Sequence, residues 1–229
     1  MKKKSFKRKP VAARPQQGAG GNQKLSSNLP GSIGAHPPSV PSPDEIQRLV
    51  ASMRQGRYTD AATRARKITG RFPDFGFAWK ILGTSFLLQG RNEKALDALL
   101  KAVSLLPEDP DLHSNLGLIY SESASFEKAE NHCRLALKFR PDDVIAHNNL
   151  GNIFQAQGRL DEAEACFRRA IDLNPKVAEA HYNLGHALQM LGRLDEAEKC
   201  YRRALEIKPQ YAEAYELSLI HISEPTRPY

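Results

Sequence analysis

The stretch that decides the fold is AHNNLGNIFQAQGRLDEAEACFRRAIDLNP, residues 146–175, whose pattern recurs 34 residues later as AHYNLGHALQMLGRLDEAEKCYRRALEIKP, residues 180–209. A repeat of this length and fixed period is typical of solenoids, in which each unit packs mainly against its neighbours. The same register extends backwards along the chain. It gives repeats at 76–109, 110–143, 144–177 and 178–211, with a weaker one at 42–75.

Prolines and glycines divide the repeats at fixed places. A proline near the end of each repeat lacks the amide donor and disfavours helix at the preceding residue, so it separates one repeat from the next. These prolines are Pro73, Pro107, Pro141, Pro175 and Pro209. A second break falls where glycine can end the first helix in a left-handed cap, at Gly56, Gly90, Gly158 and Gly192. Ala124 replaces glycine at this place once. The pattern predicts two helices per repeat, each of about a dozen residues.

Repeat 76–109 carries the fullest set of recurring residues, which are Trp79, Leu82, Gly83, Phe86, Ala95, Leu99, Ala102 and Pro107. This set resembles the tetratricopeptide repeat family. The resemblance implies an all-α fold, a right-handed α-solenoid of stacked helix-turn-helix repeats. Small residues recur where two antiparallel helices must approach closely, at Gly83, Gly117, Gly151, Gly185, Ala95, Ala129, Ala163 and Ala197. Repeat 42–75 keeps fewer of these residues and is interpreted as a degenerate N-terminal cap.

The N-terminal segment 1–41 differs in composition from the repeats. It holds eight lysines and arginines and no acidic residue, whereas the whole chain has a net charge of +7. Its Pro, Gly, Ser and Gln content predicts a disordered basic arm, because it offers little apolar surface to offset the entropy of ordering. A solubilising role is favoured, with weak nucleic-acid or anionic-membrane contact as the alternative. That contact would use Lys2, Lys3, Lys4, Lys7, Arg8 and Lys9.

The C-terminal segment begins a further repeat and then leaves the register. Residues 212–216 match the start of the earlier repeats, whereas 217–229 are unlike anything upstream. This last stretch resembles a translated sequencing adapter and is interpreted as an artefact tail, with a genuine divergent tail as the alternative. On the first interpretation the natural protein continues beyond Glu216.

The reactive side chains predict no catalytic or metal site. Three histidines recur at the repeat spacing, but adjacent repeats stack about 10 Å apart, so the three cannot converge on one metal ion. Cys133, Cys166 and Cys200 are too widely spaced for a disulfide framework and are expected to pack as small apolar groups. No cofactor, metal or enzymatic activity is expected. Free cysteines and the lack of an apolar signal segment favour a cytoplasmic location.

A row of asparagines at the repeat spacing provides the candidate binding site. Asn115, Asn149 and Asn183 each stand two residues before the recurring glycine. In tetratricopeptide solenoids this place faces the concave groove, and the row resembles that of protein O-linked N-acetylglucosamine transferases, where such amides contact the backbone of an extended peptide. The resemblance makes peptide-groove candidates of these asparagines and of His113, His147 and His181, and a purely structural role is the alternative.

We therefore expect a protein-interaction scaffold that binds an extended partner segment in the concave groove. An alternative is the N-terminal part of a glycosyltransferase, because residues 42–216 also resemble bacterial relatives of those transferases, whose catalytic region would be missing here. A further alternative is that the basic arm makes the main contact and the solenoid serves as a docking platform for nucleic-acid machinery. The repeated acidic pairs, such as Asp161 and Glu162, are expected to open the second helices and to take no part in catalysis.

Overall fold

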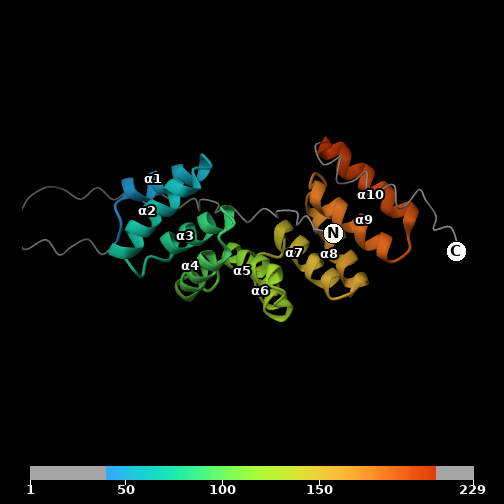
Figure 1. Cartoon of the computed structure of the whole chain (residues 1–229), viewed down its shortest axis with the longest axis horizontal. Helices are drawn as coiled ribbons and strands as arrows, with labels where there is room; N and C mark the ends of the chain where they lie inside the picture. The colour runs from blue at the N-terminus through green and yellow to red at the C-terminus, as the bar shows by residue number, and fades with distance from the viewer. Residues whose placement is uncertain (1–39, 210–229) are drawn as a thin grey trace, which may run out of the picture. The chain divides into compact units, whose positions relative to one another are not determined.

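The structure is a computed structural model that describes residues 40–209. Over that range it contains ten α-helices and no β-strand, which confirms the all-α helical repeat fold (Figure 1). The helices belong to two compact units that divide between Pro107 and Glu108. Nearly all of the predicted arm, the further repeat start at 212–216 and the tail at 217–229 lie outside the described residues. No helix between residues 40 and 209 has the length and apolar character needed to span a membrane.

The first unit is built from two helix pairs. Its helices are α1 (Pro43–Arg54), α2 (Tyr58–Arg71), α3 (Gly76–Leu88) and α4 (Asn92–Leu105). Each helix packs against the next along the chain, and α1 also contacts α3. A capping box begins the unit, since Ser42 Oγ accepts the Glu45 amide N–H at 3.3 Å and Glu45 Oε2 accepts the Ser42 N–H at 3.0 Å. Residues 42–75, which were predicted to be a degenerate cap, form the helix pair α1 and α2, as the later repeats also form helix pairs.

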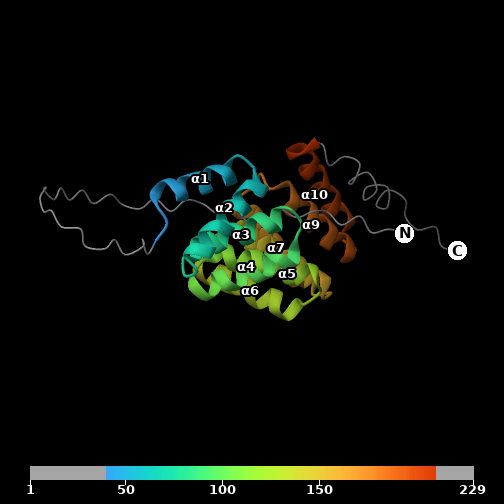
Figure 2. The same cartoon turned by 60° about the vertical axis from the view of Figure 1, so that its left-hand side comes forward.

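The second unit is built from three helix pairs (Figure 2). Its helices are α5 (Pro110–Glu122), α6 (Phe126–Phe139), α7 (Val144–Ala156), α8 (Leu160–Leu173), α9 (Ala178–Met190) and α10 (Leu194–Ile207). Successive helices pack together, and the first helices of the pairs also touch in the order α5, α7, α9. Asp109 and Asp143 cap α5 and α7, with their carboxylates accepting backbone N–H groups of the first turn. Because α7 contacts both α5 and α9, the three first helices form one row.

The breaks between the two helices of each pair have the backbone expected from the sequence. Four glycines adopt positive φ, including Gly158 at +76°, and Ala124 adopts +57° at the equivalent place. Glycine has no Cβ to oppose this left-handed conformation, so it ends the first helix and lets the chain reverse. Ala124 shows that the reversal persists with a Cβ present.

The two helices of a pair approach so closely that a side chain would not fit between them. A Cβ placed on Gly151 of α7 would lie 2.5 Å from Phe167 Cε1 of α8. One placed on Gly185 of α9 would lie 2.8 Å from Tyr201 Cε1 of α10. Real Cβ atoms do not approach other heavy atoms this closely, so the predicted role of the recurring glycines is confirmed.

The core of the second unit lies along these close contacts. Its largest fully buried side chains include Phe167 and Tyr201, and Cys133 occupies the corresponding place on α6. Alanines complete the layer, at Ala129, Ala163, Ala197 and Ala204. Alternation of small and large residues lets the helices interlock at close-packed density. Cys166 and Cys200 are half-buried against the same core, which confirms the apolar packing role expected for the cysteines.

Replacing Gly151 with alanine is expected to destabilise the protein by about 1–3 kcal/mol, because the added methyl overpacks the contact with Phe167. Gly70→Ala is the matched control. Gly70 lies in the last turn of α2, where an added Cβ would meet no atom of another helix within 4 Å, so the same change there should stabilise the protein by up to about 1 kcal/mol. Urea unfolding of both variants measures the difference. Equal effects of the two substitutions would contradict the close-contact account.

Candidate functional site

The predicted asparagine row lies on the row of first helices in the second unit. Asn115 is on α5, Asn149 on α7 and Asn183 on α9, and these helices contact one another in that order. Each asparagine precedes a close-contact glycine by two residues, which is about 200° around an α-helix. Since the glycine faces the second helix of its pair, the asparagine faces roughly the opposite way. We call this side of α5, α7 and α9 the first-helix face.

Four amide side chains gather where α7 and α9 meet. Asn152 follows Asn149 by three residues and Asn148 by four, so its side chain is a neighbour of both on α7. Asn183 Nδ2 of α9 donates a hydrogen bond to Asn148 Oδ1 at 3.0 Å. We call Asn148, Asn149, Asn152 and Asn183 the asparagine cluster. Three of its members are almost fully buried, and Asn183 is half-buried.

Two members of the cluster have donors with no acceptor. The side-chain nitrogens of Asn149 and Asn152 are buried and make no hydrogen bond to any described residue. A buried amide without a partner costs about 1–3 kcal/mol, and such groups are rare in folded proteins. Asn115 is completely buried and does have an interaction partner, so the three members of the predicted row differ in environment.

The recurrence of asparagine at the repeat spacing identifies Asn149 and Asn183 but not Asn152. Helical periodicity would have identified Asn152, because it follows Asn149 by three residues and therefore lies on the same side of the helix. The position has no asparagine in the neighbouring repeats, where Leu118 and His186 stand 34 residues on either side. A search for recurring residues alone could not find it.

Two of the three predicted histidines form hydrogen bonds to the loops between helix pairs. The Nε2–H of His147 donates to the Pro141 carbonyl at 2.9 Å, and that of His181 donates to the Pro175 carbonyl at 3.0 Å. In the first unit Trp79 uses its Nε1–H in the same way on Pro73, at 2.7 Å. At this position of the first helix, a ring N–H thus hydrogen-bonds to a carbonyl of the loop that precedes the helix. The histidines remain candidates for peptide contact, but this is their role within the chain.

His113 makes a different set of contacts. Its Nδ1 lies 3.0 Å from Nδ1 of His132 on α6, so one ring donates an N–H hydrogen bond to the other. Phe139 stacks on His113 and Tyr120 stacks on His132. Burial, together with the facing His113, lowers the pKa of His132 to about 4. No group of three potential metal-ligating side chains forms among residues 40–209.

The cysteines of the second unit are poor nucleophiles. Burial raises the pKa of the Cys133 thiol to about 12 and that of the Cys166 thiol to about 11, and nearby carboxylates act in the same direction. The pKa of Cys200 is also raised by burial. A thiol reacts as its thiolate, so these three side chains stay protonated and unreactive near neutral pH.

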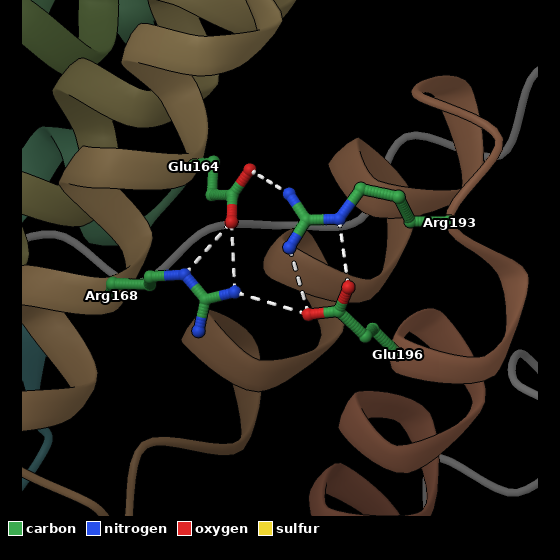
Figure 3. Close-up of polar contacts among 4 residues, drawn as sticks. All are labelled: Glu164, Arg168, Arg193 and Glu196. Atoms are coloured by element: carbon green, nitrogen blue, oxygen red, sulfur yellow. Dashed lines mark hydrogen bonds and ion pairs between the residues drawn. The ribbon is translucent and has the colours of Figure 1, made fainter.

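Charged side chains of the second unit are concentrated beside the second helices. Figure 3 shows Arg193, in the turn before α10, between Glu164 of α8 at 2.6 Å and Glu196 of α10 at 2.8 Å. Arg168 of α8 contacts the same two carboxylates at 2.8 and 3.4 Å. Arg159 pairs one repeat earlier with Glu130 at 3.0 Å and with Glu162. These pairs link consecutive helix pairs, and Glu162 and Glu196 lie in first turns as expected.

Comparison with known families identifies the repeats. Sequence patterns described as tetratricopeptide repeat match residues 50–111, 110–176 and 142–210. Together these matches span most of the chain, so the chain belongs to the tetratricopeptide repeat family. No curated protein matches the chain significantly.

Solved structures share the fold. A crystal structure of MamA aligns with a TM-score of 0.61 and 22% identity over 72% of this chain and 96% of that one. YrrB, described as a TPR protein with an unusual peptide-binding site, aligns with a TM-score of 0.61 and 21% identity over 76% and 90%. TTC0263, a thermophilic TPR protein from Thermus thermophilus, aligns with a TM-score of 0.64 and 24% identity over 77% and 98%. At these identities the likeness establishes the fold alone.

Stability should fall as the pH drops from about 7 towards about 4, because His132 has its pKa lowered in the folded protein while in the unfolded chain its pKa returns to the ordinary value of 6.5. The unfolded state then takes up more protons, which favours unfolding. Urea unfolding at about pH 7.5 and about pH 5 measures the effect. His132→Gln should weaken this dependence but not abolish it, since burial also lowers the pKa of His186. An unchanged pH dependence in that variant would contradict the assignment.

Proposed function

We propose that the chain is a protein-interaction scaffold that binds an extended partner segment on its first-helix face, through the asparagine cluster. The observation that carries this proposal is the pair of buried donors on Asn149 and Asn152 that have no acceptor within the described residues. Membership of the tetratricopeptide repeat family supports an interaction role in general, since such repeats bind protein or peptide partners. YrrB is a fold neighbour whose description includes a peptide-binding site.

The chemistry of the cluster suits a peptide backbone. An extended segment presents carbonyl and N–H groups that are not hydrogen-bonded within the segment itself, and an asparagine side chain can donate to one and accept from the other. A carbonyl of the segment that accepts from Asn149 or Asn152 removes part of the penalty of the buried donor. Recognition through the main chain would tolerate many side chains at the bound positions.

A non-catalytic role is consistent with the rest of the described chain. The thiols are held protonated, and the ring nitrogens of His147 and His181 bond to carbonyls within the chain. The transferase alternative keeps the same binding role for the repeats. It differs only in requiring a catalytic region that follows Glu216 in a longer protein.

The test begins with selection of short linear peptides from a displayed random library against the full chain. The best peptide is then titrated into the wild type and into the double variant Asn149→Leu with Asn152→Leu. We expect the double variant to bind about 5- to 150-fold more weakly, because two hydrogen bonds of about 0.5–1.5 kcal/mol each are lost. Its thermal stability should stay equal or rise, since leucine removes the unsatisfied donors at similar volume.

Asn131→Leu is the matched control, because Asn131 is an exposed residue of α6. This variant should bind the peptide like the wild type. Wild-type affinity in the double variant would overturn the proposed function. If the double variant binds more weakly while its stability is equal or higher, the binding site has been lost and the protein has not misfolded.

A further inference from the structure

The first-helix face has an unusual distribution of charge. The helices α5, α7 and α9 contain no lysine and no arginine, and their charged residues are Asp111, Glu122 and Glu179. These acids lie on the same side as the asparagine row. Asp111 and Glu122 stand four residues before and seven after Asn115, and Glu179 stands four before Asn183, spacings that keep residues on one side of a helix.

The arginines in the loops and turns beside the first helices of the second unit are already paired. Arg140, in the loop before α7, contacts Asp111 at 2.7 Å. Arg159 and Arg193, in the turns that follow α7 and α9, are held by glutamates of the second helices. Each of the three would have to leave a carboxylate in order to neutralise an anion bound elsewhere. Lys176 is exposed in the loop that precedes α9, beyond the end of that helix.

The histidines of α9 add no compensating positive charge. Burial lowers the pKa of His186, so its ring is neutral at physiological pH, and its Nδ1 hydrogen-bonds to the Gln155 side chain of α7. The His181 ring donates to the Pro175 carbonyl. Asp111 is buried and neutralised by Arg140, so the face presents neutral amides together with the carboxylates of Glu122 and Glu179.

We infer that the first-helix face selects extended segments without negative side chains, and that phosphorylation of a bound segment releases it. This inference rests on the proposed function and adds the chemical class of the partner. A phosphate brings a charge of about −1.5 to −2 at neutral pH. Placed beside the asparagine cluster it would lose solvation without gaining a counterion, because the three first helices carry no lysine or arginine.

The affinity of the face for other segments depends on the charge of their side chains. A neutral or basic residue meets no repulsion on this face, and a lysine gains attraction from Glu122 or Glu179. Asparagine and glutamine amides give directional hydrogen bonds but no net charge, so the discrimination comes from the absence of cations on the three helices. The segment that fits is an uncharged or basic stretch bound through its main chain.

The experiment uses a serine-containing peptide selected by the full chain and synthesised in three forms. These carry serine, phosphoserine or lysine at one central position, and fluorescence anisotropy gives the dissociation constant of each. We expect the phosphoserine form to bind at least about tenfold more weakly than the serine form. The lysine form should bind as well as the serine form or more tightly.

A charge-reversal variant supplies the complementary test. Glu122→Lys combined with Glu179→Lys should reduce the discrimination against the phosphoserine peptide by about tenfold or more, while its affinity for the serine form stays within about threefold. Lys199→Glu, a single charge reversal on the second helix α10, is the control and should leave the discrimination unchanged.

The outcomes separate this inference from the function on which it rests. If serine and phosphoserine forms bind equally and the Asn149→Leu/Asn152→Leu variant weakens both, the binding face stands and the charge selectivity is overturned. Tighter binding of the phosphoserine form would overturn it as well. If no form binds, or if the double leucine variant binds every form like the wild type, the proposed function fails and the inference fails with it.

Discussion

The close contact between the two helices of each repeat is the constraint on which the rest of the second unit depends. Gly151 and Gly185 admit Phe167 and Tyr201 to distances that no Cβ would allow. This contact fixes how each first helix is rotated about its own axis. Because Asn149 and Asn183 lie about 200° away from those glycines, the packing that stabilises the repeat also directs the asparagines to the opposite side. Core packing and the binding face are thus set by one arrangement.

The helix pairs of the second unit divide their polar chemistry between their two helices. The second helices and the turns before them carry guanidinium and carboxylate groups in linked pairs, such as Arg193 with Glu164 and Glu196 (Figure 3). Partly exposed pairs of this kind contribute about 0–1 kcal/mol each, so their main effect is to align neighbouring repeats and neutralise one another. The first helices carry amides, whose hydrogen bonds have direction without charge. This division explains how a chain rich in arginine can still present a face without cations.

Much of the fold follows from the sequence, because period, proline and glycine act locally. The left-handed breaks at the four glycines and the close contact at Gly151 were predicted correctly, as was the burial of Cys133, whereas the left-handed backbone of Ala124 is a finding of the structure. The asparagine row was found by its period, yet its use for peptide binding stays a prediction. Asn152 was missed because it does not recur. The bond from Asn183 to Asn148 joins different repeats, and the lack of an acceptor for Asn149 among residues 40–209 is a property of the surroundings in three dimensions. Neither can be read from spacing.

The central claim is that a partner segment supplies the missing acceptors of Asn149 and Asn152. The most direct measurement is to follow the side-chain amide resonances of asparagine by NMR while the selected serine peptide is titrated into the full chain. The account predicts downfield shifts of the Nδ2 protons of Asn149 and Asn152 as they gain an acceptor, while the exposed Asn131 on α6 is unchanged. Saturable binding of the peptide with no shift at Asn149 or Asn152 would contradict the account.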